Sequence, residues 1–192
     1  MIRAVVLYED AQQGRNFGPH QLLCGLIFDT TEQPFAAITR QVAFSALKGR
    51  DKLIGAIKDP QRWKRLAPGH APVFALLDAD KIRDHFGGKR AGARDIAEQL
   101  RRTCADPKRL RVILLERNLE TVLEAIRACD DGRTIPAALF NQSLAKNVNA
   151  RDVVLGKVGT DDGRKTMRDC VRARVPSLDR TAQLISATII DT

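Results

Sequence analysis

The chain has 192 residues, 44% of them hydrophobic, and a mean hydropathy of -0.24, which is typical of one soluble globular domain with appended or inserted pieces. These values exclude a disordered or fibrous protein, and no apolar run reaches the roughly 18 residues that a membrane helix needs. Lys and Arg exceed Asp and Glu by 32 − 23 = 9, so a polyanion is an expected partner.

The positive charge is concentrated in three segments. Residues 48–65 carry seven bases and two acids, residues 81–111 carry ten and four, and residues 142–182 carry nine and five. Together they hold 26 of the 32 bases, whereas a basic surface that served only solubility would not require clustering. The distribution favours contact with nucleic acid.

In the first part of the chain, an apolar β-favouring run predicts a strand at residues 2–8. Leucine and isoleucine at helical spacing then predict a helix at 19–29. A weaker pattern indicates a strand at 35–39. Residues 40–66 are interpreted as one or two short basic helices, inserted before the next strand and ended by prolines.

The second half repeats the alternation of strand and helix. Nearly continuous apolar runs predict buried strands at 73–77 and 111–115, each followed by a helix, at 93–104 and 119–129. Two more helices are expected at 162–174 and from Ser177 to about Ala187, where the Ser177 hydroxyl can cap the helix.

This order predicts an α/β fold with a mostly parallel central sheet flanked by helices, a helical insertion and a helical C-terminal part. We expect an α/β core over residues 1–135, with the insertion at about 40–66. Residues 136–192 are expected to form a helical extension packed on that core.

The four cysteines are separated by 80, 25 and 41 residues, so they form neither a CxxC pair nor a zinc-ligand spacing. We therefore expect four buried thiols. No secretory leader is recognisable at the start of the sequence, which favours a cytoplasmic protein.

Acidic residues follow three predicted strands. They are Glu9 after the first, Asp78 and Asp80 after the second, and Glu116 after the third, with Glu120 one helical turn later. Ligands of open α/β sheets bind at the carboxyl ends of the strands. If these strands are neighbours, the carboxylates converge and favour a site for Mg²⁺ or Mn²⁺.

Glu9 and the Asp78-x-Asp80 pair resemble the motifs of the Toprim (topoisomerase-primase) fold. More narrowly, the chain is similar to small Toprim-like bacterial proteins related to the nuclease half of overcoming-lysogenization-defect proteins. The segment from Glu116 to Glu120 and the part from Asp152 to Ile185 carry this narrower resemblance.

The resemblance implies a metal-dependent nuclease acting on DNA or RNA in phage defence. Glu9, Asp78 and Asp80 would hold Mg²⁺ or Mn²⁺, and Glu116 or Glu120 would complete the site or act as base. The expected partners are nucleic acid and an ABC-type ATPase, with a second copy of the chain as a further candidate and no membrane. Candidate phosphate-binding residues are Lys81, Arg83 and Lys157.

Two alternatives remain open at this stage. In the first, the acids are vestigial and the chain is a catalytically degenerate module that binds nucleic acid or an ATPase. This is suggested by Asp10, which stands where the Toprim pattern has glycine. In the second, Asp78 is the phosphorylated residue of a receiver-like domain, but 68 residues separate it from Asp10.

Overall fold

The computed structural model describes residues 1–9, 19–86, 92–115, 119–130 and 164–190. The chain divides into two compact units, the first formed by residues 1–12 and 39–118 and the second by 13–38 and 119–192. The domain boundary expected after residue 135 lies outside the described residues. Each helix in the described part is too short or too polar to cross a membrane.

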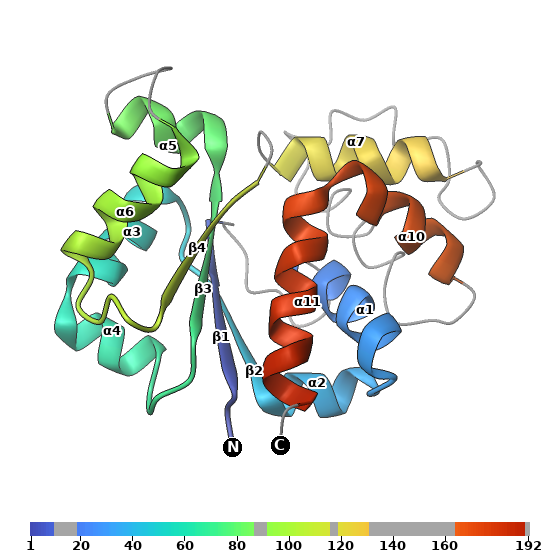
Figure 1. Ribbon diagram of the computed structural model, residues 1–192, viewed down its shortest axis with the longest axis horizontal. Helices are drawn as coiled ribbons and strands as arrows, with labels where there is room; N and C mark the ends of the chain where they lie inside the picture. Colours follow the sequence, from blue (N-terminus) through green and yellow to red (C-terminus); the bar gives the residue numbers. More distant parts are fainter. Residues whose placement is uncertain (10–18, 87–91, 116–118, 131–163, 191–192) are drawn as a thin grey trace. The chain divides into compact units, whose positions relative to one another are not determined.

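The first unit contains a sheet of four parallel strands in the order β2-β1-β3-β4 (Figure 1). The strands are β1 (Ala4–Tyr8), β2 (Val42–Ala46), β3 (Val73–Asp78) and β4 (Leu110–Leu115). The predicted α/β class with a parallel sheet is therefore confirmed. Every residue of the two central strands, β1 and β3, is buried, as the apolar run at 73–77 indicated for β3. The strand predicted at 111–115 is confirmed, but its predicted burial is wrong, because β4 is an outer strand of the sheet and only its first and last residues, Leu110 and Leu115, are buried.

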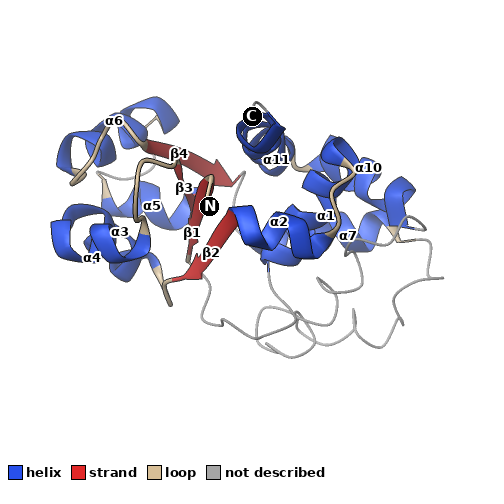
Figure 2. Cartoon of the chain, turned by 90° about the horizontal axis from the view of Figure 1, so that it is seen from below, coloured by secondary structure: helices blue, strands red, loops and turns tan. Residues whose placement is uncertain are grey.

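Four helices of this unit cover one face of the sheet (Figure 2): α3 (Arg50–Lys58), α4 (Pro60–Leu66), α5 (Ala79–His85) and α6 (Ala93–Thr103). Val5 and Leu7 of β1 share a buried core with side chains from each of these helices. Members of that core include Leu53 and Ile57 of α3, Trp63 of α4, Ile82 of α5, and Ile96 and Leu100 of α6. Burial of these apolar side chains holds the four helices against this face of the sheet.

One expectation for the first part of the chain is wrong. Residues 35–39, predicted as a strand, belong to the helix α2 (Phe35–Gln41), and the strand is β2, inside the segment interpreted as helical. Pro34 starts α2, because its carbonyl accepts from the backbone N–H groups of Ala37 and Ile38, and Ala36 and Ala37 favour a helix. The expectation of one or two short basic helices in 40–66 is confirmed, and the helices are two, α3 and α4.

The second unit is helical. Besides most of α2 it contains α1 (Pro19–Thr31), α7 (Leu119–Cys129), α10 (Lys165–Arg174) and α11 (Pro176–Ile190). Helix α1 packs against α11, and α10 packs against both α7 and α11. The predicted apolar residues of α1, Leu22, Leu23, Leu26 and Ile27, are all buried.

A fully buried ion pair joins two helices of this unit. Nε and Nη2 of Arg168 on α10 donate to the two carboxylate oxygens of Asp29 on α1, at 2.8 and 2.6 Å. Arg172, one turn later on α10, donates to the backbone carbonyl of Leu26 at 2.7 Å and lies 3.4 Å from Asp29. The pair therefore fixes how α10 lies against α1.

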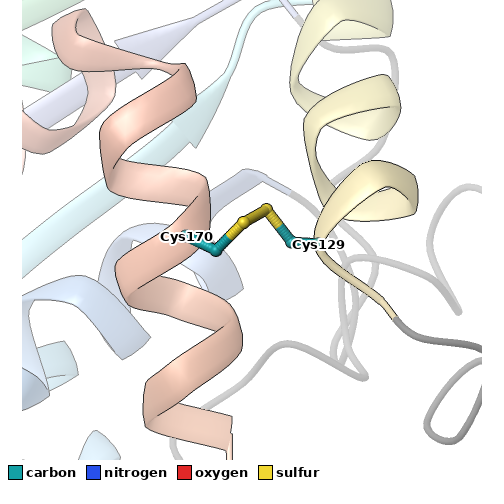
Figure 3. Close-up of a disulfide and its surroundings, with 2 residues drawn as sticks. All are labelled: Cys129 and Cys170. Carbon is teal, nitrogen blue, oxygen red and sulfur yellow. A yellow bond between two sulfur atoms is a disulfide. The ribbon is translucent and has the colours of Figure 1, made fainter.

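The expectation of four buried thiols is correct for two cysteines and wrong for the others. Cys24 and Cys104 are buried thiols, whereas Cys129 and Cys170 form a disulfide between the end of α7 and α10 (Figure 3). Their separation of 41 positions gave no sign of the pairing, because only the packing of α7 against α10 brings the two sulfurs together.

Candidate active site

The carboxyl ends of the strands form the candidate site. Strands β1, β3 and β4 are immediate neighbours in the sheet. This is the arrangement in which we expect the acids that follow them to converge. Tyr8 pairs with Leu76, and Asp78 pairs with Leu115. Glu9 and Asp78 are thus brought to the same edge of the sheet, where β3 runs into α5 (Figure 1).

Glu9 and Asp78 are in direct contact. The backbone N–H of Asp78 donates to Oε1 of Glu9 at 3.1 Å, between residues 69 positions apart in the chain. This hydrogen bond fixes a half-buried carboxylate at the point where α5 begins. The field of the first helical turn also favours negative charge there.

Asp78 itself is 6% exposed and is the N-cap residue of α5. The most common structural role of an aspartate at this position is to accept a hydrogen bond from the first turn through its side chain. Among the described residues, the Asp78 side chain makes no such capping bond. A structural capping role therefore does not account for this nearly buried carboxylate.

Of the remaining predicted acids, Asp80 alone has a side chain in the described part of the structure. Asp80 is exposed on the first turn of α5, and the described residues contain no group of three His, Cys, Asp or Glu side chains able to hold a metal ion. Glu116 lies outside the described residues. Glu120 lies in the first turn of α7, in the second unit, and its side chain is outside the described part.

Two predicted phosphate-binding residues lie on α5. Arg83 is half-buried, and its Nε is a buried donor without an acceptor in the described part of the structure. The side chain of Lys81 is not among the described features, and Lys157 lies outside the described residues. His85 packs edge-on against Phe86, with ring centroids 4.8 Å apart, which is a structural contact.

The structure adds basic residues that sequence reasoning did not assign to the site. The backbone N–H groups of Leu47 and Gly49 donate to the carbonyls of Tyr8 and Glu9, at 2.9 and 2.8 Å. These bonds place the loop carrying Lys48 beside the end of β1. An apolar run followed by Lys48-Gly49-Arg50 was the available signal, but it is informative only once residues 42–46 are recognised as a strand.

In comparisons with protein-family models, curated proteins and solved structures, nothing matched the chain. The residues at the carboxyl ends of the strands, and the similarity of their pattern to the Toprim motifs, are therefore the features from which a function can be proposed.

Proposed function

We propose that this protein is a metal-dependent nuclease that hydrolyses phosphodiester bonds of DNA or RNA. The observation that carries the proposal is the contact between Glu9 and Asp78 at the ends of two adjacent parallel strands. The hydrogen bond runs from the backbone N–H of Asp78 to the Glu9 carboxylate, so both side chains start from the same end of the sheet, where their carboxylates could supply the hard oxygen ligands that Mg²⁺ or Mn²⁺ prefers.

The donor set fits such a cation. Mg²⁺ is commonly bound through one or two carboxylates, and phosphate oxygens of the substrate and water complete its shell. Glu9 and Asp78 would supply the two carboxylates, with Asp80 or Glu116 as the next ligand or as base. When bound, the metal activates water and offsets the negative charge that develops on the phosphorus-bound oxygens. The hydrogen bond from Asp78 to Glu9 keeps one carboxylate oriented beforehand.

The cellular setting belongs to the proposal as well. The Toprim-like pattern supports an effector in phage defence, located in the cytoplasm and controlled by an ABC-type ATPase, because an unrestrained nuclease would damage its host. The net charge of +9 agrees with a nucleic-acid substrate.

Isothermal titration of Mn²⁺ tests the site. Glu9→Gln keeps an oxygen that can accept from the Asp78 N–H, and Asp78→Asn keeps the side-chain shape, so each removes charge with little change in packing. We expect each variant to lose Mn²⁺ binding and Mn²⁺-dependent cleavage of an oligonucleotide. The matched control is Asp95→Asn, an exposed acid on α6.

The proposal is overturned if wild type binds no Mn²⁺ even with an oligonucleotide present, or if both variants bind it as wild type does. Asp80→Asn is measured alongside them. Loss of Mn²⁺ binding in the Asp80→Asn variant would show that Asp80 is a further ligand of the metal.

A second candidate is a module that binds nucleic acid or an ATPase without turnover. It is favoured by the lack of a three-ligand group among the described residues. This module would bind nucleic acid with an affinity that falls as salt rises, and would show no cleavage with any divalent metal or with an ATPase partner.

A further inference from the structure

The outer face of α3 is basic. Its inner face buries Leu53, Ile54, Ala56 and Ile57. The exposed positions of the helix are Asp51, Lys52 and Lys58, with the half-buried Gly55 between the two lysines. No apolar side chain is exposed on this face.

Arg62 of the next helix, α4, completes this face. A Cβ atom added to Gly55 would lie 3.7 Å from Nη1 of Arg62, so the guanidinium group lies over the bare backbone of Gly55. Positions 52, 55 and 58 are three residues apart, which is a rise of about 4.5 Å per step along the helix. Each step also turns about 60° around the helix, so Lys52, Arg62 and Lys58 form a row of cations that slants across the helix surface.

The two nearby acids are already engaged within the protein. Oδ1 of Asp51 accepts from Nε of Arg50 at 3.0 Å, and Oδ1 of Asp59 accepts from the backbone N–H groups of Gln61 and Arg62. In the described part of the structure, no acid lies within ion-pair distance of Lys52, Lys58 or Arg62. Their charge is therefore available to an external anion.

The row begins at the candidate active site. Lys48 is exposed, lies four residues before Lys52, and has a φ of 55°, a left-handed conformation that is uncommon for a lysine. The Gly49 N–H bond to the Glu9 carbonyl, 2.8 Å long, fixes this conformation beside Glu9. A strained non-glycine residue at such a place is a frequent feature of functional loops.

We infer that Lys48, Lys52, Arg62 and Lys58, together called the basic ridge, bind the sugar-phosphate backbone of a nucleic-acid strand and lead it to Glu9 and Asp78. This inference rests on the proposed function and names the surface that holds its substrate. A nucleic-acid strand carries about one charge per 3.4 Å of helix rise, so cations about 5–6 Å apart along the helix surface can each meet a phosphate of the strand. A lipid surface would call for apolar side chains beside the bases, and this face exposes none.

Fluorescence anisotropy with a labelled single strand and a labelled duplex tests the ridge, over a range of NaCl concentrations and in EDTA. The ridge variant is Lys52→Gln/Lys58→Gln/Arg62→Gln. Its matched control is Lys165→Gln/Arg174→Gln/Arg180→Gln, three exposed bases of the second unit. Both triple variants change the net charge from +9 to 9 − 3 = +6.

We expect the ridge variant to bind at least about tenfold more weakly, with a log-log salt slope reduced by about 2–3, since each lost phosphate contact removes about 0.7–0.9. The control should remain within about threefold of wild type. Equal weakening of both variants, no weakening of the ridge variant, or no binding by wild type would overturn the inference. Ridge-dependent binding to phosphatidylserine vesicles that exceeds binding to nucleic acid would overturn the choice of partner.

Lys48 provides a second readout. Lys48→Gly relieves the left-handed backbone and Lys48→Gln retains it, while both remove the charge. We expect the glycine variant to unfold at a higher urea concentration than the glutamine variant, and both to bind nucleic acid more weakly. Retained binding in both would exclude Lys48 from the ridge.

Because EDTA removes metal from the binding assay, this assay tests nucleic-acid binding by the basic ridge independently of metal-dependent cleavage. One of the two proposals can therefore be refuted while the other stands. Loss of binding in the ridge variant together with no Mn²⁺ site would leave a non-catalytic nucleic-acid-binding protein. An Mn²⁺ site with unchanged binding in the ridge variant would leave a nuclease whose substrate follows another surface.

Discussion

Among single residues, Arg168 has the most demanding environment. Its side chain is fully buried, both of its hydrogen bonds to Asp29 are charge-assisted, and its guanidinium carbon lies 5.9 Å from the centre of the Phe28 ring. The desolvation penalty of burying two charges offsets much of the free energy gained from their attraction. The pair therefore makes the packing of α10 on α1 specific and adds little net stability.

Removing one partner of this pair should be far more damaging than removing both. We expect Asp29→Asn to lower the free energy of unfolding by about 3–5 kcal/mol, because it leaves the buried guanidinium uncompensated. Urea unfolding measures the change. The control Asp169→Asn disrupts an ion pair whose acid is 52% exposed and should cost less than about 1 kcal/mol. An Asp29→Asn/Arg168→Met variant less stable than Asp29→Asn would contradict the argument.

For single residues of the candidate site, the sequence predicts some contacts and not others. Glu9 and Asp78 could be placed together because the ends of parallel strands share an edge, whatever the rest of the chain does. The approach of Arg62 to Gly55 could not be predicted, since it depends on the angle at which α4 returns across α3. The same holds for the loop at Lys48, whose position depends on hydrogen bonds to β1.

Among the elements, α4 has the clearest local determinant. Asp59 ends α3 and caps α4, and Pro60 occupies the first turn of α4, where its missing N–H costs nothing. The backbone N–H groups of Arg62 and Gln61 donate to the Asp59 carboxylate and lower its pKa from the usual 3.8. The cap thus links the direction of α4 to the ionisation of one side chain.

This cap makes part of the stability depend on pH. Because the pKa is lowered in the folded state, ionised Asp59 stabilises the protein above about pH 4, and this contribution is lost as the pH falls through the lowered value. We expect wild type to be more stable than Asp59→Asn at pH 7, and the difference to shrink at about pH 3. Urea midpoints at the two pH values measure this. The exposed Asp84→Asn serves as control, and an unchanged gap at both pH values would argue against the cap.

The elements that sequence patterns predicted well are those with buried or periodic apolar residues, such as β3, α6 and α7. The sequence patterns missed the helices α2 and α5 and the strand β2, which is an outer strand of the sheet in which only Val42 is buried. It also follows α2 without a turn, so no glycine or proline separates helix from strand. Short edge strands are specified by their neighbour, here β1, more than by their own composition.

On the scale of the whole molecule, the cysteines provide a direct test of the packing of each unit, because Cys104 lies in the first unit and the other three cysteines lie in the second. Burial raises the pKa of Cys24 to about 12 and raises the pKa of Cys104 as well, so both thiols should resist alkylation in the folded protein. Cys129 and Cys170 are half-buried and become reactive only after reduction.

We therefore expect iodoacetamide at about pH 8 to add no group to the native protein, two after mild reduction, and four after reduction and unfolding. Mass spectrometry of the intact chain and of its peptides counts and locates the groups. Labelling of Cys129 without prior reduction would exclude the disulfide. Labelling of Cys24 in the folded state would contradict its burial in α1.

The division of the chain has a consequence for how the protein is made on the ribosome. Helix α1 is synthesised early, yet α11, against which it packs, is complete only at residue 190. At roughly 5–20 residues per second, α1 has to wait about 8–30 s with Leu22, Leu23 and Leu26 unburied. The sheet-containing unit can close in the meantime. Nascent chains of this protein should therefore depend on a chaperone that shelters a single apolar helix until α11 has been synthesised.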